Sequence, residues 1–152
     1  MNTIGKDVIV EQEITKSSFI TYLKKVTSVE EAKSYIKEIK ELHPSATHHV
    51  TSYLVGPTGE HGHANDDGEP SGTAGLPILN ILKKKELDCI LAVVIRYFGG
   101  IKLGAGGLVR AYSKSVRDAV IASDLVDAVK GYRMNVIISY DMQKNLDYLL
   151  KN

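Results

Sequence analysis

The chain has 152 residues, of which 43% are apolar and 24% are charged, a composition typical of one folded globular domain that needs no disulfide or metal to hold it together. Its net charge of +1 at pH 7 excludes a generally basic protein, so any site for an anionic partner has to be local. One cysteine excludes an internal disulfide and a multi-cysteine zinc site, and with neither a membrane-length apolar segment nor a signal peptide we expect a cytoplasmic protein without membrane association.

The first half of the chain predicts strands around one helix. Three short segments of alternating or β-branched residues predict strands, namely Val8–Ile14, Phe19–Leu23 and Thr47–Val55. Thr15–Ser18 is the expected turn between the first two strands. Ser28 as N-cap and Glu31 reaching back to it form a capping box, which predicts a helix that runs to about Leu42.

The middle of the chain predicts a long loop, a helix and a buried strand. Residues Thr58–Gly72 show no helical or strand periodicity, and loops of this length are usually functional or disordered. A second helix is predicted to begin between Thr73 and Leu76, with Pro77 near its first turn. The unbroken apolar run within Leu87–Tyr97 predicts a central strand that is buried on both faces.

The last third of the chain predicts a helix followed by a partial second unit. The helix runs from about Ala105 to Ser123, and Ala122–Gly131 is expected to be a linker. The sequence then predicts a strand at Tyr132–Tyr140 and the start of a helix at Met142–Leu150. We therefore expect an α/β domain over residues 1–128, and a linker with a partial second domain, strand plus helix only, over residues 129–152. An unfinished second domain would leave a strand edge exposed, so a homodimer is one expected arrangement.

A glycine-rich segment, Gly99–Gly107 (the glycine loop), lies between the predicted central strand and the third helix. Glycines allow backbone N–H groups to approach a ligand, and the helix N-terminus with Lys102 and Arg96 would favour an anion such as phosphate. The alternative is that the glycines only let the helix pack closely on the sheet. The loop matches neither a Walker A nor a dinucleotide-binding pattern.

The third helix carries a cationic stripe that continues the positive charge of the glycine loop. Its members are Arg110, Lys114 and Arg117, which are spaced i, i+4 and i+7. This spacing places them on one side of the helix and suits a phosphate backbone. The alternative is an ordinary solvated helix face, and Asp118 dilutes the stripe. The complete set of candidate anion- or nucleic-acid-binding residues is Arg96, Gly99, Gly100, Lys102, Gly104, Gly106, Gly107, Arg110, Lys114 and Arg117.

A second segment, Asp66–Gly75 (the acidic loop), carries three carboxylates and leads into the second helix. With the histidines upstream of it, this segment could ligate a metal or supply acid–base catalysis. The alternative is that its carboxylates order the loop and stabilise the helix N-terminus. It contains neither a serine-hydrolase elbow nor a zinc-protease or deaminase motif, so we assign no catalytic residue, metal or cofactor.

The residues of these two segments together resemble the YigZ/IMPACT family. The resemblance is densest over Asp66–Leu79 and Val94–Tyr112 and also includes Ala46 and His49. It implies an α+β fold like the second domain of a small-subunit ribosomal protein and domain IV of elongation factor G, with a mixed sheet of about four strands and helices packed on one face. In bacterial members a ferredoxin-like domain follows, and the tail of this chain looks like its opening strand and helix. The family-signature residues of the acidic loop are Asp66, Asp67, Glu69, Ser71, Gly72, Thr73 and Gly75.

The resemblance implies a translation-related binding protein rather than an enzyme. Eukaryotic members regulate translation by competing with a starvation-signalling kinase for its activator, largely through protein contacts. For this chain we expect RNA, the ribosome or a protein of the translation machinery as the partner. The alternative is a nucleotide- or phosphate-binding enzyme, a phosphotransferase or hydrolase, in which Gly99–Gly107 holds the phosphate while Asp66, Asp67 or Glu69 holds Mg²⁺ or acts as base.

Overall fold

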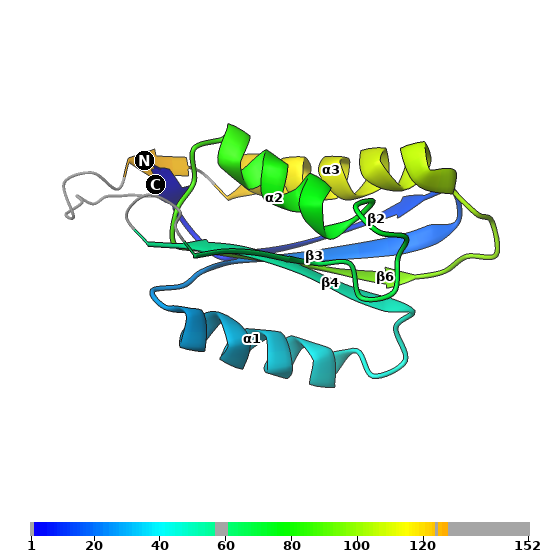
Figure 1. The fold of residues 1–152 in the computed structure, drawn as a ribbon, viewed down its shortest axis with the longest axis horizontal. Coiled ribbons are helices and arrows are strands. Elements are labelled where there is room, and N and C mark those ends of the chain that lie inside the picture. The colour runs from blue at the N-terminus through cyan, green and yellow to red at the C-terminus, as the bar shows by residue number, and fades with distance from the viewer. Residues whose placement is uncertain (1, 57–60, 124, 128–152) are drawn as a thin grey trace.

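A computed structural model describes residues 2–56, 61–123 and 125–127 as a central sheet with helices on both faces (Figure 1). The elements in chain order are β1 (Asn2–Ile4), β2 (Val8–Ile14), β3 (Ser17–Lys25), α1 (Val29–Leu42), β4 (His48–Val55), β5 (His61–Asn65), α2 (Gly75–Lys84), β6 (Ile90–Tyr97), α3 (Gly104–Ala122) and β7 (Leu125–Asp127). The sheet has five strands in the order β2-β3-β6-β4-β5, and every neighbouring pair is antiparallel. A separate antiparallel pair joins β1 to β7.

The predicted α+β class is confirmed, but the predicted arrangement of its layers is wrong. The sheet has five antiparallel strands instead of about four mixed ones, and the helices cover both of its faces instead of one. The connection from β3 to β4 passes through α1, and these two strands flank β6, so α1 crosses the sheet on one face while α2 and α3 cover the other. An amphipathic pattern predicts that a helix packs on a sheet, but it does not specify the face.

The central strand β6 supplies both hydrophobic cores. Ile90, Ala92 and Val94 pack in the core beneath α2 and α3, whereas Leu91, Val93 and Ile95 pack in the core shared with α1. All six positions are fully buried. The prediction of a strand buried on both faces is therefore confirmed, because successive side chains of a strand point to opposite faces of the sheet.

Two short edge elements lie where the sequence predicts no regular structure. β5 lies within the predicted loop Thr58–Gly72 and pairs with β4, and β7 lies within the predicted linker Ala122–Gly131 and pairs with β1. The residues of β5 have no apolar alternation, so its pairing rests on backbone hydrogen bonds that a side-chain pattern does not reveal. The strand and helix predicted after Tyr132, and the homodimer suggested by them, lie outside the described residues.

The β2–β3 hairpin closes through a tight turn that later forms one wall of the site. Ile14 pairs with Ser17, which leaves Thr15 and Lys16 as the two turn residues. Both have positive φ, 49° and 71°, as a two-residue turn matched to the twist of its strands requires. The predicted turn is thus present, although β3 begins two residues earlier than expected.

The N-terminus of α1 is capped largely as predicted. Ser28 Oγ accepts a hydrogen bond from the backbone N–H of Glu31 at 3.0 Å. The Glu31 carboxylate accepts from the backbone N–H of Thr27 at 2.6 Å, one residue earlier than the expected partner. We expect Ser28→Ala to lower the free energy of unfolding by about 1 kcal/mol, because one helix N–H loses its acceptor. Urea unfolding measures this, and Ser34→Ala on the exposed side of the same helix should have no destabilising effect.

Candidate functional site

A buried ion pair joins the acidic loop to the strand that leads into the glycine loop. Glu69 and Arg96 are only 7% and 5% exposed, and their side chains meet at 2.8 Å between Oε2 and Nη1. The Tyr112 hydroxyl of α3 donates to the same carboxylate oxygen at 2.5 Å. Burial and the neighbouring Glu69 carboxylate raise the pKa of Tyr112 well above its usual range, so the hydroxyl remains a donor. The contacts of Glu69 with Arg96 and Tyr112 thereby link the acidic loop, β6 and α3.

Arg96 therefore does not belong to a solvent-facing anion surface, which corrects the sequence-based assignment. Its remaining guanidinium nitrogens donate to Ser17 Oγ at 3.3 Å, at the start of β3. The sequence did contain a signal for the burial of Arg96. Side chains two residues apart in a strand share a face, so Arg96 lies on the same face as Ala92 and Val94, which pack in the core beneath α3. The Glu69 carboxylate balances the charge of Arg96. The spacing of these two residues in the sequence does not predict that they form a pair.

Asp66 orders the acidic loop and the start of α2. One carboxylate oxygen accepts the backbone N–H of Gly72 at 2.9 Å, and the other accepts those of Ala74 and Gly75 at 3.2 and 2.8 Å. Partial burial opposes ionisation, but these three N–H groups outweigh it and hold the pKa of Asp66 below its usual value. Ala74 at the N-cap provides no side-chain acceptor, so Asp66 caps α2 from eight residues upstream.

Asp67 and Thr73 of the acidic loop, and His48 beside it, also make hydrogen bonds within the protein. Asp67 has a positive φ of 47° and accepts the backbone N–H of His49 at 2.7 Å. His48 donates through Nδ1 to the Asp67 carbonyl at 2.8 Å, and its Nε2 lies 3.4 Å from Glu69. The Thr73 hydroxyl donates to a loop carbonyl at 2.6 Å. These contacts favour the loop-ordering interpretation over a metal or acid–base site, and among the described residues no three His, Cys, Asp or Glu side chains are grouped to hold a metal ion.

Removing the Asp66 carboxylate should destabilise the domain in a pH-dependent way. We expect Asp66→Asn to lower the free energy of unfolding by about 1–3 kcal/mol at pH 7, because charge-assisted hydrogen bonds to the backbone are weakened. The folded-state pKa is depressed, so the wild-type advantage is complete above the unfolded pKa of about 3.9 and disappears as pH falls through the folded value. Urea unfolding from pH 3 to pH 7 tests this, with Ser71→Ala, an exposed position of the same loop, as the control.

The glycines of the two loops have two structural roles. A Cβ on Gly99 would lie 1.8 Å from the Lys16 carbonyl oxygen, and one on Gly75 would lie 2.8 Å from the Asn65 backbone nitrogen. Both positions therefore allow close contact between two backbone segments, and for Gly99 these are far apart in the chain. Three other predicted site glycines are needed for their conformation, since a positive φ occurs at Gly72, Gly100 and Gly104.

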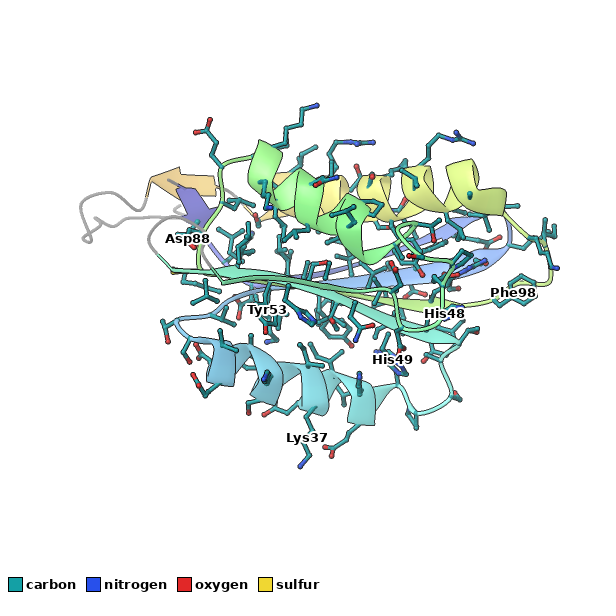
Figure 2. All side chains as sticks on the ribbon, viewed as in Figure 1. Lys37, His48, His49, Tyr53, Asp88 and Phe98 are labelled. Carbon is teal, nitrogen blue, oxygen red and sulfur yellow. The ribbon has the colours of Figure 1, made fainter. Side chains whose placement is uncertain are left out.

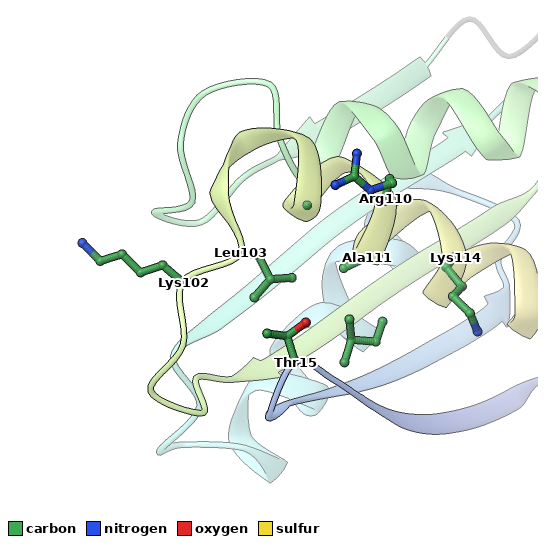
Figure 3. Close-up of a pocket in the computed structure, with 8 residues that line it drawn as sticks. Thr15, Lys102, Leu103, Arg110, Ala111 and Lys114 are labelled. Atoms are coloured by element: carbon green, nitrogen blue, oxygen red, sulfur yellow. The ribbon is translucent and has the colours of Figure 1, made fainter.

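Three of the predicted cations line one open depression of about 270 Å³ at the start of α3, and the Lys102 side chain extends outward from its edge (Figure 3). Lys102 comes from the glycine loop, and Arg110 and Lys114 come from successive turns of α3. Lys102 and Arg110 make no ion pair with the part of the chain that the structure describes. The residues that line this depression are Ile14, Thr15, Lys102, Leu103, Gly107, Arg110, Ala111 and Lys114.

Lys114 is already paired within the protein. Its Nζ lies 2.7 Å from the Asp118 carboxylate and donates to Gln12 at 3.1 Å. The hydrogen bond from Lys114 lowers the pKa of Asp118, so this carboxylate is charged at neutral pH and opposes the cationic stripe. Arg117 is exposed on α3 but does not line the depression. The predicted stripe is thus divided, because Arg110 and Lys114 line the depression and Arg117 does not.

Sequence reasoning missed one wall of the depression completely. Ile14 and Thr15 come from the β2–β3 hairpin, about 90 residues before the helix that they face. No motif or spacing connects these residues to Lys102 or Arg110. Only the position of β2 beneath α3 reveals them.

Comparison with known proteins identifies the family. The family described as Impact N-terminal domain matches residues 15–120, which include both loops and the depression except Ile14. The chain belongs to the IMPACT family. It is 54% identical over 107 residues to the IMPACT family member YvyE of Bacillus subtilis, covering 70% of this chain and 49% of that protein. It is 44% identical over 115 residues to YigZ of Escherichia coli, covering 74% and 56%.

A crystal structure described as that of a hypothetical protein shares the fold of this IMPACT domain. The TM-score is 0.78 at 41% identity, over 82% of this chain and 62% of that one. The chain spans about half the length of the curated IMPACT relatives it matches. No helix within the described ranges is long and apolar enough to cross a membrane.

Proposed function

We propose that this IMPACT-family chain is a non-catalytic binding protein of the translation machinery that holds RNA phosphates on the surface formed by Lys102, Arg110, Lys114 and Arg117. The observation that carries the proposal is that three of these cations line one open depression. Lys102 and Arg110 make no ion pair with the described residues. Positive charges that are not paired within the protein attract a phosphate backbone. The family resemblance supplies the translational setting.

The length of the cationic surface favours a chain of phosphates over a single one. Arg110 and Arg117 are seven residues apart on α3, which corresponds to roughly 10 Å along the helix axis. Lys102 extends the positive charge beyond the N-terminus of the helix (Figure 3). A polyanion can contact all of these positions at once, whereas one phosphate group cannot.

The state of the acid–base groups supports a binding role. Asp66 and Asp67 accept backbone N–H groups, and Glu69 is held between Arg96 and Tyr112. Both ring nitrogens of His48 face protein oxygens, so neither is directed at a substrate. A general base needs a lone pair within reach of a substrate proton, and these groups are engaged within the fold.

Reversing the two unpaired cations tests the surface. We expect Lys102→Glu with Arg110→Glu to weaken binding of a short unstructured RNA on the order of 100-fold, because attraction is lost and repulsion is added. Replacing both by Gln should lower the slope of log affinity against log salt by about 1.4, at about 0.7 per phosphate contact with a single strand. Fluorescence anisotropy across a salt series measures both quantities.

A matched control lies on the opposite face of the sheet. Lys37 and Lys40 are exposed on α1, and Lys37 points away from the sheet (Figure 2). Reversing both makes the same change in net charge but should leave RNA affinity within about two-fold, since α1 is on the far side of the domain. Asp118→Asn should raise affinity by about two- to three-fold because it releases Lys114. Equal losses from the two double reversals would contradict the proposed surface.

A second candidate is a nucleotide-binding enzyme that uses the same depression. The first turn of α3 has no side-chain cap, since Leu103 occupies the N-cap, and such a helix start favours a phosphate group. Calorimetry with ATP, GTP and Mg²⁺ distinguishes the candidates. Saturable nucleotide binding that excludes RNA would support the nucleotide-binding candidate, and absence of heat would contradict it.

A further inference from the structure

We propose that the depression at the start of α3 seats one unstacked nucleotide, so that this surface selects single-stranded over double-stranded RNA. The inference rests on the proposed RNA-binding function and adds the conformation of the RNA that is recognised. It follows from the chemistry of the floor of the depression, which a site for phosphate alone does not explain.

The floor of the depression is apolar while its rim carries the charges. Among the lining residues Ala111 is buried and Ile14 and Leu103 are half-buried, and these three form the floor, whereas Lys102, Arg110 and Lys114 are exposed. In Figure 3, Leu103 and Ala111 lie between Lys102 on one side and Lys114 on the other. Phosphates gain nothing from apolar surface, whereas the face of a base or the carbon atoms of a ribose are stabilised by contact with it. The arrangement therefore suits a ligand with an uncharged body and anionic groups at either side.

The volume of the depression fits one such unit. About 270 Å³ lies just below the range of roughly 300–1,000 Å³ for pockets that enclose a whole small ligand. A single base or nucleoside can occupy it, while the adjoining phosphates remain outside on the rim. The exposed face of α3 then continues with Arg117, which can receive the next part of the chain.

An RNA duplex cannot place a base on the apolar floor of the depression. Its bases are stacked and paired inside the helix, so a protein meets mainly phosphates and 2′-hydroxyl groups. A duplex would contact the rim cations and leave the apolar floor uncovered. A single strand can turn one base out of the stack and place it on the floor, as proteins that read single-stranded RNA do with splayed bases. The difference in affinity between the two forms therefore measures occupation of the floor.

Thr15 adds a polar group to this wall of the depression at a backbone position that disfavours it. Its φ is 49°, and a β-branched residue at positive φ is uncommon because its side chain crowds the backbone. Glycine or asparagine suits such a turn better. The threonine side chain lines the depression, where its hydroxyl can bond a base edge or a 2′-hydroxyl. A strained residue at this place is consistent with a role in binding.

The experiment compares a single-stranded oligouridylate of roughly 12 nucleotides with an RNA duplex of the same length, by anisotropy at fixed salt. We expect the wild type to bind the single strand about 10-fold or more tightly. Ile14→Ala should reduce this affinity about five-fold and leave duplex affinity unchanged, because only apolar contact is removed. Ile9→Ala, the same change at an exposed position of the same strand, should change neither.

Thr15→Gly separates a binding effect from misfolding. This variant should unfold at a higher urea concentration, since the strain at positive φ is relieved, yet it should bind the single strand about three-fold more weakly. Equal affinity for the two RNA forms, with Ile14→Ala and Thr15→Gly unchanged in binding, would overturn the nucleotide pocket and leave the phosphate surface standing. Absence of binding to either RNA would instead overturn the proposed function itself.

Discussion

Replacing Glu69 by alanine is expected to lower the free energy of unfolding by about 3–5 kcal/mol, because it leaves the Arg96 guanidinium buried without its counter-charge. The Tyr112 hydroxyl would lose its acceptor in the same step. Urea unfolding at pH 7, followed by circular dichroism, measures the change. The loss would be a large share of the stability of a domain of this size.

A double variant distinguishes an uncompensated charge from a simple cavity. Glu69→Leu combined with Arg96→Met removes both charges and keeps apolar volume, so it should be at least about 1 kcal/mol more stable than Glu69→Ala. Glu38→Ala, at an exposed position of α1, should change stability by no more than about 0.5 kcal/mol. If the double variant were as unstable as Glu69→Ala, the unpaired guanidinium would not be the cause.

Replacing Gly99 by alanine should destabilise the domain by about 3 kcal/mol. The added Cβ would lie 1.8 Å from the Lys16 carbonyl oxygen, which is rigid backbone of the β2–β3 turn, so one of the two segments has to move. Gly99 also donates its N–H to Ser17 Oγ, at 3.3 Å, and this contact would be strained by the same movement. The measurement is again the free energy of unfolding in urea.

Gly106→Ala is the matched control for the glycine loop. A Cβ there would meet only the end of the flexible Arg110 side chain, at 3.3 Å, and the position lies in the first turn of α3. Alanine should therefore stabilise the helix by about 0.5–1 kcal/mol. Changes of opposite sign in the free energy of unfolding would show that the two glycines have different structural roles. Equal losses of stability at both positions would contradict this explanation.

Several elements were predictable because their signals are local. The N-cap at Ser28 and the turn after Ile14 depend on residues within a few positions of one another. The burial of the strand Ile90–Tyr97 on both faces follows from its unbroken run of apolar residues. The residues of Asp66–Leu79 and Val94–Tyr112 also sufficed to recognise the family. The three cations of the depression were among the predicted site residues for the same reason, since the spacing of Arg110 and Lys114 along α3 and the place of Lys102 just before that helix are local properties.

The tertiary structure alone decided which of these residues face solvent and which face one another. Arg96 belonged to the predicted anion surface, but its long-range partner Glu69 makes it an internal charge. Ile14 and Thr15 became part of the site through the packing of the hairpin under α3. Periodicity and capping act between near neighbours, whereas the face that a helix covers, the pairing of an edge strand and the partner of a buried charge depend on contacts between residues far apart in the chain.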